Sequence, residues 1–178
     1  MPPRPSTAVP KQSTQLQPHS DSHDINGDDP VLNQIIYHGG VELGSPVALT
    51  GSSADIAGLS MTVRTRGGAL MVLFTGERNA TFSGTATSAT ITVGVETSLI
   101  VGLLNIAAYN DTVEIKTANA ETQTLSGEWP GTLTWIYTPL QGEYTVKIKA
   151  SFISDSTAGN IDTGCNLQVF ELLPLRRD

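Results

Sequence analysis

The sequence has few of the features that cross-link, charge or membrane-anchor a protein. Cys165 is the only cysteine among 178 residues, so no disulfide can form within the chain. Charged residues make up 15%, below the quarter that is usual for soluble domains. The longest apolar run, residues 99–109, is too short to span a bilayer and contains Asn105. We therefore expect a soluble chain that does not associate with a membrane.

Positive charge is also scarce. The formal net charge is −7 and the isoelectric point is about 4.8, so phosphate backbones are repelled and nucleic-acid binding is not expected. The first ten residues lack the apolar segment of a secretory signal, which indicates synthesis in a cytoplasm. No spacing of catalytic residue types stands out. We expect no enzyme activity, no metal and no cofactor.

Hydroxyl residues take the place of the missing charges. The chain contains 22 Thr and 15 Ser, and β-branched Thr suits a half-exposed pleated surface. Residues 143–152 alternate strictly between polar and apolar, which predicts a strand with one packed and one solvated face. Similar runs recur with Gly and Pro between them. The sequence predicts an all-β fold: a jelly-roll-like antiparallel β-sandwich of about eight strands.

Three local features add detail to this fold. Residues 132–138 alternate like residues 143–152, and the intervening "PLQG" is typical of a turn, so we expect these two strands to pair as a hairpin. Residues 97–109 suit either a strand or a helix. Cys165, in a strand-like segment, is expected to be a small buried side chain.

The N-terminal residues differ from the rest. Residues 1–30 hold six of the ten prolines and few aliphatic side chains, which is the composition of an extended arm. We therefore divide the chain into an arm, 1–30, and a sandwich domain, 31–178. An arm of this kind cannot bury enough apolar surface to order itself, so we expect it to lie on a partner. The candidate contact residues in the arm are Arg4, Val9, Lys11, Leu16 and Ile25.

Three motifs could have a binding or catalytic role, and each is weighed against a purely structural role. His19 and His23 in "HSDSHD" have a spacing that zinc could use on a helix, but Pro18 and the Ser and Asp content favour a solvated segment. His38, beside two glycines, is expected to be a loop histidine. Trp129 in "GEWPG" is either an exposed anchor for a sugar or protein, or a lid packed over the sandwich.

Residues 85–172 resemble virion proteins of tailed bacteriophages. The resemblance rests on "SATITVGVETSLIVGLLN", "TLTWIYTPLQGEYTVKIKASF" and "NLQVFEL". It is to capsid decoration (cement) proteins and head-fibre domains with a trimeric jelly-roll sandwich, and it names no catalytic residue.

The resemblance implies a virion structural protein on the capsid exterior. Such a protein would be a homotrimer that binds the major capsid protein and stabilises capsomer junctions. The candidate subunit contact is Leu99, Val101 and Leu103. The alternative is a phage fibre, spike or carbohydrate-binding module that recognises a host surface, with Trp129 as its candidate anchor.

Overall fold

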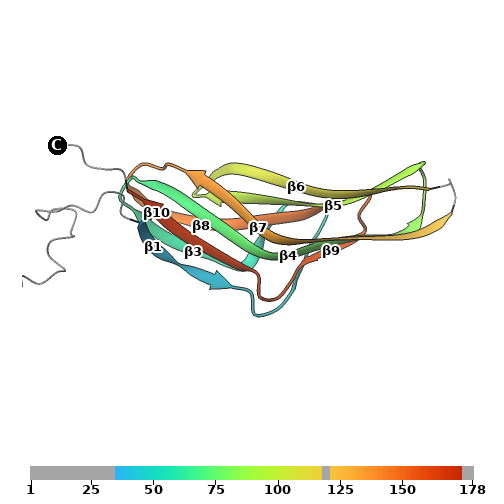
Figure 1. Cartoon of the computed structure of the whole chain (residues 1–178), viewed down its shortest axis with the longest axis horizontal. Helices are drawn as coiled ribbons and strands as arrows, with labels where there is room; N and C mark the ends of the chain where they lie inside the picture. Colours follow the sequence, from blue (N-terminus) through green and yellow to red (C-terminus); the bar gives the residue numbers. More distant parts are fainter. Residues whose placement is uncertain (1–34, 118–120, 174–178) are drawn as a thin grey trace, which may run out of the picture. The chain divides into compact units, whose positions relative to one another are not determined.

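A computed structural model describes residues 35–117 and 121–173. All the regular structure in these residues is β-strand, in two antiparallel sheets packed face to face (Figure 1). The predicted all-β sandwich is confirmed. The proposed arm contacts Arg4, Val9, Lys11, Leu16 and Ile25, and the histidines of "HSDSHD", lie outside the described residues. The boundary at residue 30 stays a prediction.

The first sheet, sheet A, has the strand order β1-β10-β4-β9-β2, with β7 on the other side of β4. Its strands are β1 (Ile35–Glu42), β2 (Val47–Ala48), β4 (Ala69–Thr85), β7 (Thr122–Tyr137), β9 (Ala158–Ile161) and β10 (Asn166–Leu172). The long strand β4 pairs with β7 along its whole length. On its other edge β4 pairs first with β10 and then with β9.

The second sheet, sheet B, has the order β3-β8-β5-β6. Its strands are β3 (Ala54–Thr65), β5 (Thr90–Val101), β6 (Leu104–Lys116) and β8 (Gly142–Ser154). Long strands therefore run β1-β10-β4-β7 in one layer and β3-β8-β5-β6 in the other. This is the order of a jelly roll, in which the chain passes repeatedly between the layers.

The expected hairpin between residues 132–138 and 143–152 is wrong. β7 pairs with β4 in sheet A, while β8 pairs with β3 and β5 in sheet B. The turn residues before Gly142 carry the chain from one layer to the other. Alternation shows that each strand has one packed face, but it does not show which strand lies beside it.

The core lies between the two sheets, and the alternating positions point into it. Val146, Ile148 and Ala150 of β8 are at most 1% exposed, as their spacing predicts. They pack with Leu70, Val72 and Phe74 of β4, which are fully buried. A smaller cluster of Ala86, Ile91 and Val93 fills the other part of the sandwich. Apolar burial of this kind contributes about 25 cal/mol per Å².

Residues 97–109, which suit strand or helix, form the end of β5, a turn at Gly102 and Leu103, and the start of β6. Gly102 has φ +62°, which L side chains rarely adopt, so the glycine permits the tight turn. The register shifts between Leu99 and Ile100, because β6 carries an extra residue, Ile106, that bulges opposite them.

Candidate functional site

The three residues predicted as a subunit contact do not share one environment. Leu99 and Val101 point into the core and are 0% and 1% exposed. Leu103 lies in the β5–β6 turn and is fully exposed. Only Leu103 of the three can therefore reach a second subunit without rearrangement of the core. The subunit contact itself stays a prediction.

Trp129, the candidate surface anchor, lies within β7 and not in a loop. Its ring is half-buried and packs against both core clusters. A Cβ at Gly127 would come within 2.5 Å of this ring, so the glycine makes room for it. The structure shows Trp129 packed on the core, and its role as a surface anchor stays a prediction.

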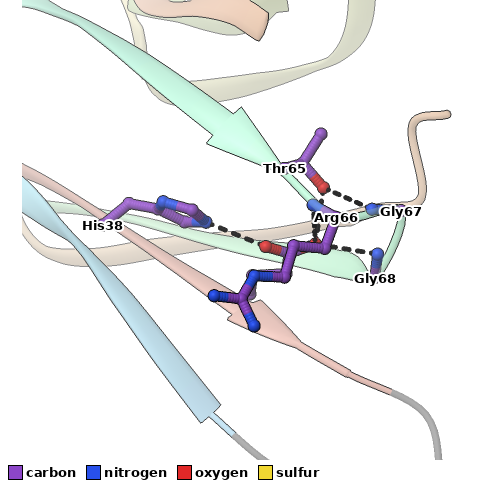
Figure 2. A network of polar contacts seen from close by, with 6 residues as sticks. His38, Thr65, Arg66, Gly67 and Gly68 are labelled. Carbon is purple, nitrogen blue, oxygen red and sulfur yellow. Dashed lines mark hydrogen bonds and ion pairs between the residues drawn. The ribbon is translucent and has the colours of Figure 1, made fainter. Parts of the chain in front are cut away.

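A buried carboxylate joins three elements of the fold, and Figure 2 shows its contacts with His38, Thr65 and the turn at Gly68. Glu171 of β10 is 0% exposed. Its Oε1 accepts hydrogen bonds from Thr65 Oγ1 at 2.6 Å and from the Arg66 and Gly68 amides at 2.8 Å each. Its Oε2 lies 3.0 Å from Nε2 of His38 in β1. The network ties β10 to β1 and to the turn between β3 and β4.

The carboxylate of Glu171 is held in its charged form. Burial raises its pKa, but the hydrogen bonds from Thr65, the two amides and His38 outweigh burial and leave the pKa below its ordinary value. An acceptor with four partners has little capacity left to take a proton from a substrate. We read the network as a structural anchor and not as a catalytic base.

Cys165 is fully buried, as expected. Its Sγ donates to the carbonyl of Glu77 at 3.3 Å. Burial raises the pKa of this thiol, so the thiolate needed for a nucleophile is disfavoured. Across residues 35–117 and 121–173, no three His, Cys, Asp or Glu side chains gather as metal ligands would. The same residues include no helix long and apolar enough to cross a membrane.

The outer face of sheet A carries an unusual run of apolar side chains. The strand register aligns Ile136, Met71, Phe170 and Tyr37 in one row across β7, β4, β10 and β1. The neighbouring row aligns Ala69, Leu172 and Ile35. We call six of these residues the apolar zone: Ile35, Ala69, Met71, Ile136, Phe170 and Leu172.

The next rows of the same face are polar. One aligns Thr134, Leu73 and Gln168, and the next aligns Thr132, Thr75 and Asn166. Thr75 and Thr132 are joined by a hydrogen bond of 2.9 Å between their hydroxyl groups. The face therefore changes from aliphatic to hydroxyl and amide along the strands.

An open groove of about 240 Å³ lies where these two parts meet at the β1 edge of sheet A. We call it the β1–β10 groove. It is lined by Tyr37, Gly40, Val41, Glu42, Asn166 and Gln168. Tyr37 is 57% exposed. The centre of its ring lies 5.0 Å from the centre of the Phe170 ring, and the two ring planes are tilted by 37°. The groove thus offers an aromatic ring beside a carboxylate and two amides.

The shape of β1 sets the direction of Tyr37. The register against β10 shifts between Tyr37 and Gly39, and Gly39 has φ +135°. This bulge turns His38 inward to Glu171 while Tyr37 and Gly40 both line the groove. A Cβ at Gly40 would lie 2.9 Å from the Tyr37 hydroxyl oxygen, so the glycine leaves room for the phenol. The buried anchor therefore positions the groove.

Acidic groups lie further along sheet A. Reduced contact with water raises the pKa of Glu77, and the nearby carboxylates of Asp162 and Glu128 raise it further. Asp162 also accepts hydrogen bonds from the amide groups of Asn79 and Asn160. With Glu42 in the groove itself, this end of the face is negatively charged.

The outer face of sheet B differs in kind. It carries mainly charged and hydroxyl side chains, among them Arg64, Glu96, Thr145, Lys147 and Lys149. Asp55 accepts from Lys147 at 2.7 Å and lies 3.7 Å from Lys149. A second groove of about 420 Å³ here is lined by both lysines, Glu96 and Leu103, among others. It offers no aromatic ring.

Sequence reasoning missed the β1–β10 groove. Its residues come from two strands that are over a hundred positions apart in the chain. The alternating pattern of "NLQVFEL" does place Gln168 and Phe170 on one face. No sequence signal places them beside Tyr37, because the pairing of β1 with β10 depends on the whole fold.

Comparison with known proteins gives only distant similarities. No family model matches the sequence, and no curated protein matches it. Among solved structures, the C-terminal domain of EclA, described as a sugar-binding protein, has TM-score 0.33 and 17% identity. It covers 81% of this chain and 85% of its own.

Two carbohydrate-binding modules are also similar. A family 36 module in complex with calcium and xylotriose has TM-score 0.31 and 14% identity, covering 79% of this chain and 99% of its own. A family 35 module from an environmental isolate has TM-score 0.22 and 17% identity, covering 80% and 98%. At TM-scores this low, the superpositions fix neither the family nor the ligand of this chain.

Proposed function

We propose that this protein is a non-catalytic glycan-binding module and that the β1–β10 groove is its site. The observation that carries the proposal is the exposed ring of Tyr37 beside Glu42, Asn166 and Gln168 in one open groove. A sugar presents apolar C–H faces and a rim of hydroxyl groups. An aromatic ring packs on the first, and carboxylate and amide groups bond to the second.

The charge around the groove favours a neutral glycan. Glu42 lines the groove, and Glu77, Glu128 and Asp162 lie near one another beyond it in the same sheet. No lysine or arginine is among the lining residues of this groove. An anionic sugar would be repelled by these carboxylates, whereas hydroxyl groups can donate to Glu42. We therefore expect neutral hexoses or pentoses to bind and uronic acids to bind poorly.

The proposal predicts the effect of removing the aromatic ring. Tyr37→Ala should weaken binding of a neutral oligosaccharide about tenfold, since loss of ring packing on the order of 1.4 kcal/mol corresponds to that factor. A screen of neutral and acidic oligosaccharides followed by titration calorimetry measures the change. Tyr37 is more than half exposed, so the variant should fold.

The matched control is Lys147→Ala, which alters the groove on the outer face of sheet B. It should leave glycan affinity unchanged. Absence of binding by the wild-type protein to any neutral glycan in the screen would contradict the proposal, as would equal affinity of wild type and Tyr37→Ala.

A second candidate function is the decoration of a phage head, in which the protein binds the major capsid protein as part of a virion. It is favoured by Leu103, which is fully exposed, and Leu140, which is 83% exposed, both in connections between strands. A leucine side chain offers a sugar no hydrogen-bonding group, so these two suit a protein partner better than a glycan. Retention on empty phage heads, without binding to glycans, would favour this candidate.

A further inference from the structure

If the outer faces of both sheets were in contact with water, both should carry mainly polar side chains. The two faces differ in this respect. In a two-layer sandwich the outward positions of each strand are normally polar. Sheet B follows this rule with Thr145, Lys147 and Lys149 on β8. Sheet A departs from it in the apolar zone, where Ile35 is 62% and Ile136 is 65% exposed. Nothing among the described residues covers these two side chains.

The apolar zone is contiguous and not a scatter of single side chains. Ile136 is paired with Met71, and Met71 with Phe170, on adjacent strands of one sheet. Neighbouring strands lie about 4.8 Å apart, so side chains on the same face of paired positions touch. Contiguous exposed apolar surface marks an interaction site, whereas isolated apolar residues need no explanation.

The zone also lacks charge, which lets a second copy of this acidic chain approach it. Its six members are all uncharged, in a chain whose formal net charge is −7. Two copies of so acidic a chain repel one another unless they meet through a neutral face. The acidic groups Glu77, Glu128 and Asp162 lie further along sheet A, away from the zone. A second copy of this chain can therefore approach over the zone without bringing like charges together.

We propose that the apolar zone is the centre of an interface between copies of this chain. Six side chains are fewer than the roughly 20 residues that each partner contributes to a standard interface, so the zone forms the centre and polar rows form the rim. Thr134 is suited to that rim, because it flanks the zone and carries a hydrogen-bonding hydroxyl group. The β1–β10 groove borders the interface, so an oligomer presents several grooves at once and gains avidity.

The test is the mass of the full chain in solution. Sedimentation velocity across micromolar concentrations should show an oligomer for the wild type. Ile136→Glu should shift it to monomer, because the new carboxylate would be buried against an apolar face. Ile136 is 65% exposed within one chain, so the variant should fold, as circular dichroism can verify.

The matched control is Thr145→Glu, which adds the same charge at an exposed strand position on the outer face of sheet B. It should keep the mass of the wild type. A monomeric wild type, or an Ile136→Glu variant with wild-type mass, would overturn the proposal. The result is separate from glycan binding, because Ile136→Glu should keep the affinity for a monovalent oligosaccharide and Tyr37→Ala should keep the mass.

Discussion

At the scale of single residues, Glu171 does the most to define the region around the groove. Its two oxygens hold the β3–β4 turn through Thr65, Arg66 and Gly68, and hold β1 through His38. Gly68 is required there, because a Cβ would lie 2.6 Å from the carbonyl oxygen of Leu172. A fully buried charge of this kind is stable because it accepts hydrogen bonds, three at Oε1 and one at Oε2.

We expect Glu171→Gln to destabilise the protein by about 2–4 kcal/mol, since a neutral amide turns an NH₂ group towards donors that need an acceptor. The loss should depend on pH. The folded pKa of Glu171 lies below its ordinary value of 4.5, so the carboxylate stabilises the fold above about pH 4.5. That contribution disappears as the pH falls through the folded pKa. Urea unfolding at several pH values measures both effects.

The control for this experiment is Glu143→Gln, at an exposed position near the start of β8. It should change the free energy of unfolding little at any pH. If Glu171→Gln had wild-type stability at neutral pH and the same acid dependence as the wild type, the anchor would have no energetic role.

At the scale of elements, the strands of one layer are joined to those of the other by more than the apolar core. Arg78 of β4 is only 3% exposed, and its Nε donates to Asp111 of β6 at 3.2 Å, across the two sheets. Its guanidinium carbon lies 5.7 Å from the centre of the Phe74 ring. An arginine on the inward face of β4 is tolerated because its guanidinium group pairs with a carboxylate and packs on an aromatic ring.

The β5–β6 hairpin allows one substitution to be compared in two environments. Leu99→Ala should cost about 2–5 kcal/mol of unfolding free energy, because the side chain is fully buried and leaves a cavity. Leu103→Ala, four positions away in the exposed turn, should change stability by less than about 0.5 kcal/mol.

Chemical denaturation of both variants measures the difference between Leu99 and Leu103. A large loss of unfolding free energy for Leu103→Ala would show that Leu103 is buried in solution. Its partner would then lie outside the described residues of one copy. A loss for Leu99→Ala no greater than that for Leu103→Ala would contradict the burial of Leu99 in the core.

At the scale of the whole molecule, both proposed functional surfaces lie on sheet A. The outer face of sheet B carries mainly charged and hydroxyl side chains. The β1–β10 groove and the apolar zone share β1 and β10, and both depend on the pairing of the first described strand with the last. The jelly-roll order creates this arrangement, because it brings Ile35 beside Leu172.

Deletion of residues 1–30 tests whether the sandwich alone associates. The apolar zone lies wholly within residues 35–172, so the truncated chain should form an oligomer with the same number of copies as the full chain. Light scattering coupled to size-exclusion chromatography measures it. A monomeric truncated chain beside an oligomeric full chain would assign the contact to the first thirty residues and not to sheet A.

The sequence by itself determined the class of the fold and much of its core. Alternation is a local property, so Val146, Ile148 and Ala150 could be placed on a buried face without knowing any neighbour. The burial of Cys165 was expected for another reason, namely that a free cysteine behaves as a small hydrophobic side chain. The scarcity of charge and the wealth of Thr likewise indicated strands with hydroxyl-bearing surfaces.

Only the tertiary structure decided which strands are neighbours, and the candidate site depends on that. β7 and β8 look like a hairpin in sequence but lie in different sheets. Tyr37 and Gln168 form one groove because β1 pairs with β10, a contact between distant parts of the chain. Backbone hydrogen bonds are the same for any pair of strands, so pairing is chosen by how all the apolar faces pack at once, which no single segment encodes.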